Sequence, residues 1–178
     1  MRDIEPSTQS TGWFAIRTKD DFKAENILRS YCAEVFFPKE TVKTSGKRSR
    51  TRAIIPHVLF IKTSRERAIE LEEASRRLSG IPFSFWIYRY PDDKEIRQIP
   101  DKSIELVKLL TIKDSECEIF NKNDFKRNDK VRIVDGIFRG YEGYVQRVKK
   151  NLHVVVEITG VCAIMLPFIH PDLLEKIE

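Results

Sequence analysis

The sequence of 178 residues has few of the features that announce a secreted, metal-binding or membrane protein. Its three cysteines, Cys32, Cys117 and Cys162, lie far apart without a CxxC pair, so we expect neither a disulfide framework nor a zinc site. No apolar run approaches the roughly 18 residues of a membrane span, and the N-terminal MRDIEPSTQST lacks the apolar stretch of a signal peptide. These absences predict a cytoplasmic protein with reduced thiols.

Signatures of catalysis are also missing. The sequence contains no GxSxG, P-loop, HExxH or paired-cysteine motif, and His57, His153 and His170 stand isolated. The acidic pairs Asp20-Asp21 and Asp92-Asp93 fall at an expected helix start and an expected turn, where they have ordinary structural roles. We therefore expect no catalytic residues, no metal site and no cofactor.

The charge of the chain is basic and unevenly distributed. The net charge is +5, and residues 1–115 hold 22 Lys and Arg against 17 Asp and Glu, which accounts for the whole surplus. A hydrophobic content of 41% suffices for a packed core. The surplus favours an anionic partner for the first part of the chain.

The first part of the chain alternates between strand and helix patterns. Thr18 with Asp21, and Thr63 with Glu66, have the spacing of capping boxes at two helix starts. The patterns predict a βαββαβ-like order with an extra strand and a terminal helix. The expected strands are at 12–18, 34–37, 53–61, 83–88 and 96–99, and the expected helices are at 20–31, from 64 onwards and at 101–111. A basic hairpin loop is expected at 43–52. This order indicates an α+β fold with helices packed on an antiparallel sheet.

The last part reads as short strands separated by glycine turns. Gly136, Gly140 and Gly143 cluster after an alternating strand that begins at Lys130, and strand patterns resume from Gly143 to residue 166. This pattern predicts a small all-β barrel. The expected organisation is a disordered tail at 1–11, an α/β domain at 12–111, a linker at 112–123 and the barrel domain at 124–178.

These features together resemble the NusG family of transcription factors, in which an N-terminal domain precedes an SH3-like KOW barrel. The resemblance covers residues 12–178, and the segments that carry it are Trp13–Ile16, Ile54–Leu59, Ile99–Asp101 and Asp135–Phe138 with Gly143. The runs FIHPDLLEKIE and RRLSGIPFSFWIYR are most similar to the specialised, UpxY-like antiterminators of capsule operons in Bacteroidetes.

Two departures from the family pattern stand out. Pro56-His57-Val58 replaces the usual Pro-Gly-aromatic, and Thr159 and Val161 flank Gly160, where general factors often carry an aromatic and a basic residue. The first change lies in the segment that the resemblance assigns to polymerase binding. The second lies where the resemblance implies that the barrel binds Rho or a ribosomal protein.

The resemblance implies a monomeric, non-enzymatic elongation and antitermination factor that grips the clamp helices of RNA polymerase and suppresses pausing or termination. It implies an apolar groove for the polymerase, formed by Trp13, Phe14, Ile55, Pro56, His57 and Val58. A proline in a strand prefers an edge or a bulge, which favours such a groove. The alternative is that these residues are simply core.

Basic residues supply a second expected surface, for DNA of the transcription bubble or for nascent RNA. They are Arg17, Lys19, Lys23, Lys47, Arg48, Arg50 and Arg52. Contacts from such residues to phosphates would be salt-dependent and would not read sequence. The alternative is an ordinary solvated charged surface.

Aromatic residues raise two further possibilities. Phe83, Phe85, Trp86, Tyr88 and Tyr90 could stack on bases, although their close spacing places most of them in the core. A partner site is expected at the KOW corner, which comprises Gly136, Phe138, Tyr141 and Gly143, with an aromatic core plug as the alternative. Two other functions stay open: a small Mg-dependent nucleic-acid-processing enzyme, and a ribosome-associated KOW RNA-binding protein.

Overall fold

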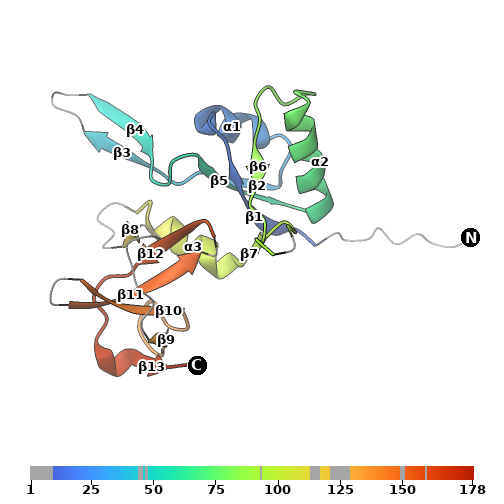
Figure 1. Ribbon diagram of the computed structural model, residues 1–178. Coiled ribbons are helices and arrows are strands. Elements are labelled where there is room, and N and C mark those ends of the chain that lie inside the picture. Colours follow the sequence, from blue (N-terminus) through green and yellow to red (C-terminus); the bar gives the residue numbers. More distant parts are fainter. Residues whose placement is uncertain are drawn as a thin grey trace, which may run out of the picture. The chain divides into compact units, whose positions relative to one another are not determined.

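The structure is a computed structural model that describes residues 10–43, 46, 48–92, 94–112, 117–120, 129–148, 151–158 and 160–178. These residues form a mixed α/β protein with antiparallel sheets (Figure 1). The chain divides into two compact units, one of Met1–Phe37 with Pro56–Asp101 and the other of Pro38–Ile55 with Lys102–Glu178. The predicted tail, apart from residues 10 and 11, lies outside the described residues.

The first unit is built on a sheet of order β2-β5-β1-β6, with β7 also pairing to β1. Its strands are β1 (Gly12–Arg17), β2 (Glu34–Phe36), β5 (Val58–Thr63), β6 (Trp86–Ile87) and β7 (Gln98–Ile99). The apolar runs of β1 and β5 explain their central position, because both faces of these strands are buried. The short strands β6 and β7 pair with successive parts of β1 along its other edge.

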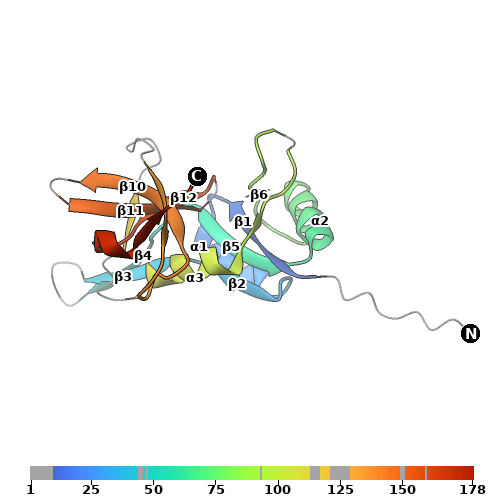
Figure 2. The same cartoon turned by 90° about the horizontal axis from the view of Figure 1, so that it is seen from below.

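Two helices pack against this sheet. α1 (Asp21–Leu28) contacts β5 and β2, and α2 (Arg65–Arg76) lies beside β6 in both views (Figure 1, Figure 2). The predicted capping boxes are wrong in detail. The N-cap of α1 is Asp20 without a side-chain cap, and α2 is capped one residue later than predicted, by Ser64, whose hydroxyl accepts from the amide of Arg67 at 3.2 Å.

The second unit contains a basic hairpin, β3 (Lys39–Lys43) with β4 (Ser49–Ala53). The sequence predicts a hairpin loop at 43–52, but residues 49–53 form a strand that pairs with residues 39–43. It also contains most of α3 (Asp101–Leu109). A six-stranded antiparallel sheet of order β13-β9-β10-β11-β12-β8 completes it. These strands are β8 (Glu118–Phe120), β9 (Lys130–Ile133), β10 (Glu142–Val148), β11 (Asn151–Ile158), β12 (Cys162–Met165) and β13 (Leu174–Lys176), and a short 3-10 turn, η1 (Pro171–Leu173), precedes β13.

The glycine corner between β9 and β10 explains two of the clustered glycines. Gly140 has φ of 79° and its amide donates to the carbonyl of Ile133 at 2.6 Å, which reverses the chain. A Cβ at Gly143 would lie 2.4 Å from the carbonyl oxygen of Val155, so β10 can approach β11 there only without a side chain. The corner therefore forms as the spacing predicts. The closed KOW barrel remains a prediction, since the strand pairings define a sheet.

The observed boundaries differ from the predicted ones. The structure places β8 within the predicted linker 112–123, where residues 118–120 pair with β12. α3 and the hairpin group with the second unit, whereas the sequence patterns placed them in the first domain. None of the helices in the described ranges has the length and apolar content that a membrane crossing requires.

Candidate functional site

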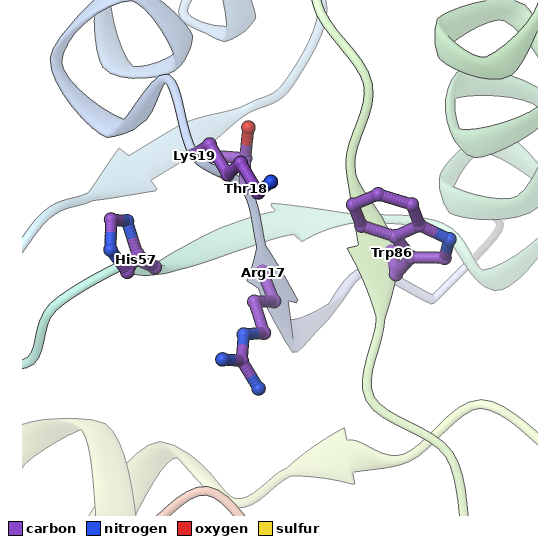
Figure 3. Close-up of a pocket in the computed structure, with 5 residues that line it drawn as sticks. All are labelled: Arg17, Thr18, Lys19, His57 and Trp86. Atoms are coloured by element: carbon purple, nitrogen blue, oxygen red, sulfur yellow. The ribbon is translucent and has the colours of Figure 1, made fainter.

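A hollow in the first unit lies where β1 ends. It has a volume of about 590 Å³ and is lined by Arg17, Thr18, Lys19, His57 and Trp86 (Figure 3). We call it the β1-end pocket. Its lining comes from three segments that are far apart in the sequence: the end of β1, the turn before β5, and β6.

Strand register explains why these residues meet. Arg17 is directly opposite Trp86 of β6 on one side and opposite Val58 of β5 on the other. Residues opposite each other in an antiparallel pair project to the same face, so the guanidinium and the indole share a face of the sheet. His57 immediately precedes β5 and its carbonyl accepts from the amide of Thr18 at 3.0 Å, which holds the turn beside the end of β1.

The turn at Pro56-His57 has a special backbone. His57 has φ of 66°, a conformation that favours glycine but that His adopts more readily than bulky or branched residues. Its imidazole lies at the surface, with Nδ1 3.9 Å from a carboxylate oxygen of Asp21. Glycine, which the resemblance leads us to expect here, would adopt this positive φ without strain.

Thr18 connects the β1-end pocket to the segment that precedes β6. It is buried, its hydroxyl donates to the carbonyl of Ser84 at 2.9 Å, and the same oxygen accepts from the amide of Asp20 at 3.2 Å. Lys23 of α1 is also anchored, because its ammonium donates to the carbonyl of Pro82 at 2.8 Å. Arg17 and Lys19 are exposed, which gives the pocket two cations at its mouth.

The expected polymerase groove divides into buried and exposed residues. Trp13, Phe14, Ile55 and Val58 are all buried, between 1% and 6% exposed, so in this structure they do not form an open groove. Trp13 and Phe14 lie on β1 and Val58 on β5, the central strands that are buried on both faces, whereas Ile55 lies in the bend before β5. The burial of these four residues agrees with the alternative, a core role. Pro56 and His57 are exposed, and only they offer a surface from this set.

The basic hairpin presents a second cationic surface. Arg50 and Arg52 are exposed, and their spacing of two residues places them on one face of β4, while the exposed Arg48 directly precedes the strand. Arg52 also donates to Glu40 on β3 at 2.7 Å. Lys47 lies outside the described residues.

The glycine corner has a buried aromatic and a half-buried one. Phe138 is 6% exposed and contacts Tyr141, with ring centroids 6.5 Å apart. The Tyr141 hydroxyl donates to the carbonyl of Lys102 in α3 at 3.0 Å, and burial, with the nearby Glu105 and Cys117, raises the pKa of Tyr141. Phe138 thus fills a small core, and the corner's exposed apolar side chain is Ile137, which sequence reasoning missed.

A smaller hollow of about 240 Å³ adjoins this corner. It is bounded by Asp135–Phe138, by residues 167–170 and by Leu173, and the exposed Phe168 stands at its edge. In the residues that the structure describes, no group of three or more His, Cys, Asp or Glu side chains is arranged to hold a metal ion.

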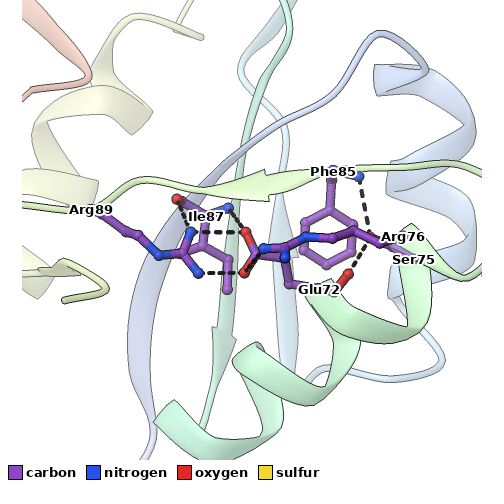
Figure 4. A network of polar contacts seen from close by, with 6 residues as sticks. All are labelled: Glu72, Ser75, Arg76, Phe85, Ile87 and Arg89. Atoms are coloured by element: carbon purple, nitrogen blue, oxygen red, sulfur yellow. Dashed lines mark hydrogen bonds and ion pairs between the residues drawn. The ribbon is translucent and has the colours of Figure 1, made fainter. Parts of the chain in front are cut away.

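Beneath β6 lies a polar network that joins α2 to the pocket strand (Figure 4). The carboxylate of Glu72 is 1% exposed, accepts from the amide of Ile87 at 2.8 Å and from Arg89 at 2.9 Å, and pairs with Arg76 at 3.0 Å. Burial by itself would raise the pKa of Glu72, but the hydrogen bonds from Arg89 and Ile87 and the two guanidinium charges outweigh it and lower the pKa. The ion pair with Glu72 raises the pKa of Arg89.

Comparisons with known proteins give distant structural likenesses. No protein-family model matches the sequence, and no curated protein is significantly similar to it. A structure described as domain interaction in Thermotoga maritima NusG aligns over 95% of this chain and 98% of that chain, with 17% identity and a TM-score of 0.46. The MjSpt4:Spt5 complex in conformation B aligns over 93% and 97%, with 20% identity and a TM-score of 0.31. Since these TM-scores lie below 0.5, we infer nothing about function from them.

Proposed function

We propose that this chain is a non-enzymatic transcription elongation and antitermination factor that binds the clamp helices of RNA polymerase and suppresses pausing or termination at specific operons. The order of the sequence motifs along residues 12–178 supports this proposal. One structural observation carries it further. His57, expected at the polymerase surface, and Arg17 and Lys19, expected at the nucleic-acid surface, line one pocket.

This arrangement suits a protein that touches polymerase and nucleic acid at adjoining positions. Exposed cations near a groove attract phosphates through a salt-dependent term. A factor that binds one polymerase conformation more tightly than another shifts the equilibrium toward it, which is how such a factor would disfavour the paused state. The corner around Gly136, Phe138, Tyr141 and Gly143 would serve a second partner, with Rho and a ribosomal protein as candidates.

A pull-down with core RNA polymerase tests the central claim. The wild-type chain should retain polymerase, and the double variant Pro56→Ala/His57→Asn should retain less, because these are the exposed residues of the expected surface. Asparagine tolerates the positive φ of His57, so the turn keeps its backbone. Ile55→Asp should also weaken retention, but Ile55 is buried and the variant's folding must be checked by circular dichroism.

In vitro transcription supplies the functional readout. The wild-type chain should shorten pauses or increase read-through at a terminator, whereas the Pro56→Ala/His57→Asn variant should do so less at equal concentration. Failure of the folded wild-type chain to bind polymerase in any salt condition would refute the proposed function. Cleavage or modification of the nucleic acid in a Mg²⁺-dependent manner would favour the enzyme hypothesis instead.

A further inference from the structure

Trp86 is an exposed side chain between buried apolar neighbours in a segment where burial alternates. Phe83, Phe85 and Ile87 are at most 3% exposed, whereas Trp86 is 52% exposed. Alternation along an extended segment requires this, because the side chains on either side of Trp86 point into the core. An indole left in water keeps a large apolar surface available for contact.

The surroundings of this indole identify the chemistry of its partner. Arg17 lies directly opposite Trp86 in the strand register and Lys19 lines the same pocket, so an apolar ring stands beside two exposed cations. The pocket volume of about 590 Å³ lies within the range of about 300–1,000 Å³ typical of small-molecule sites. A flat aromatic group attached to a negative charge matches both features, and an unpaired nucleotide is such a group.

We propose that the β1-end pocket takes one unpaired base of a single-stranded nucleic acid, stacked on the indole of Trp86, with the neighbouring phosphates on Arg17 and Lys19. Stacking on aromatic rings beside a basic track is the general way in which proteins hold single strands without reading their sequence. The inference deepens the proposed function and rests on it in one respect, namely that Arg17 and Lys19 face nucleic acid.

The segment that carries the indole is fixed from behind by α2. The amide of Ile87 donates to Glu72, and the amide of Phe85 donates to the hydroxyl of Ser75 at 3.3 Å, so both neighbours of Trp86 are bonded to one helix (Figure 4). β6 itself has only two ladder positions on β1. The structure therefore makes Glu72 and Ser75 positioning residues, which hold the stacking surface in place without touching the ligand.

The experiment uses the full chain and fluorescein-labelled probes of twelve thymidines, twelve uridines, and a twelve-position strand with abasic sugars at its centre. Anisotropy at several salt concentrations gives the affinity and its salt slope. We expect wild-type protein to bind the thymidine or uridine probe more tightly than the abasic probe. Trp86→Ala should weaken binding to the intact probes by about 5- to 150-fold, which corresponds to the usual contribution of one stacked base. The DNA and RNA arms show which strand is the source of the base.

Tryptophan fluorescence gives a second readout that needs no loss of affinity. The chain has two tryptophans and Trp13 is buried, so quenching by a bound base should come from Trp86 and disappear in Trp86→Phe. Equal binding of intact and abasic probes by the wild-type chain would overturn the proposal, and so would unchanged binding by folded Trp86→Ala. Absence of binding to every probe at low salt would overturn it as well.

The positioning residues have their own test. Glu72→Gln and Ser75→Ala should reduce discrimination between intact and abasic probes while the salt slope stays unchanged, because no phosphate contact is lost. The matched control Glu73→Gln, at an exposed position of the same helix, should leave discrimination intact. By contrast, Arg17→Ser with Lys19→Ser should flatten the salt slope. Polymerase pull-down of Trp86→Ala separates the two proposals, since retention by this variant leaves the proposed function standing whatever the oligonucleotides show.

Discussion

At the scale of single residues, Glu72 combines full burial with a charge. Its carboxylate compensates for the lost water through Arg89, Arg76 and the amide of Ile87. Breaking a buried ion pair costs about 3–5 kcal/mol, and we expect the lower part of this range for Glu72→Gln because both arginines are partly exposed. This residue therefore links the stability of the first unit to pH.

The pH dependence has a defined sign. The pKa of Glu72 in the folded chain lies below its ordinary value of 4.5, so its contribution to the free energy of unfolding is complete above that value and is lost as the pH falls through the folded pKa. We expect urea denaturation to separate wild-type and Glu72→Gln proteins at pH 7, and the difference to shrink as the pH falls from 4.5 through the folded pKa of Glu72. A constant difference across this range would contradict the assignment.

Gly143 supplies a second prediction at the residue scale. The Cβ of an alanine there would lie 2.4 Å from the carbonyl oxygen of Val155. Because this oxygen belongs to the backbone, no side-chain rotation can relieve the clash. Gly143→Ala should lower the free energy of unfolding by about 1–3 kcal/mol, the usual cost of overpacking. The exposed Arg147→Ala on the same strand is the control and should unfold near the wild-type denaturant concentration.

At the scale of elements, the basic hairpin offers a direct electrostatic test. If Arg48, Arg50 and Arg52 contact phosphates, replacing all three with Ser should reduce the slope of log affinity against log salt by about 2 for a single strand. The variant Arg65→Ser/Arg67→Ser/Arg77→Ser removes the same charge from the region of α2 and serves as control. Equal salt slopes for the two triple variants would mean that the hairpin is an ordinary solvated charged surface.

Elements were predictable from sequence where the pattern is local. The run at Trp13–Ile16, the stripe of α2 and the glycine corner all formed near the expected positions. The strand predicted at 53–61 begins only at Val58, because Pro56 and His57, which has a positive φ, form a turn before it. β8 was missed because its three residues gain their partner only through pairing with β12, which no local pattern reveals. The capping of α2 lies one residue later than predicted because Ser64 is a better N-cap than the neighbouring Thr63.

The candidate site was predicted only in part, for a similar reason. Arg17, Lys19 and His57 were singled out from the sequence, but their meeting with Trp86 depends on the register of β1 with β5 and β6. The five clustered aromatics gave no sign that Trp86 and Tyr90 would be the exposed ones. Glu72 and Arg89 are 17 residues apart in the sequence, and the loop between them interrupts the helical pattern of α2, so no local pattern predicts that they pair. A pattern of alternating burial would have selected Trp86 once the strand phase was known.

At the scale of the whole molecule, the division into two units changes which fragment should fold. A fragment of residues 124–178 lacks β8, which pairs with β12, and α3, whose Lys102 carbonyl accepts from Tyr141. We expect residues 102–178 to unfold at a higher urea concentration than residues 124–178, as measured by circular dichroism. Identical midpoints would mean that α3 and β8 contribute nothing to this unit.

The assignment of activity to the two parts is a separate whole-molecule prediction. Residues 1–115 contain Arg17, Lys19, His57, Trp86 and the basic hairpin, and carry the whole net positive charge. They should bind polymerase and shorten pauses when expressed alone, and residues 124–178 should not replace them. An in vitro transcription assay in which only the second fragment alters pausing would reverse the assignment.

The interleaving of the two units along the chain has a consequence for synthesis on the ribosome. The first unit is complete when Asp101 has emerged, whereas the second begins at Pro38 and ends only at Glu178. At about 5–20 residues per second, the hairpin segment emerges several seconds before the last strand of its own unit. The first unit can therefore fold, with residues 38–55 as an insertion in its chain, before the rest of the second unit has been synthesised. The order of folding is set by the order of translation, and slowing translation after residue 101 should leave the first unit protease-resistant on the nascent chain.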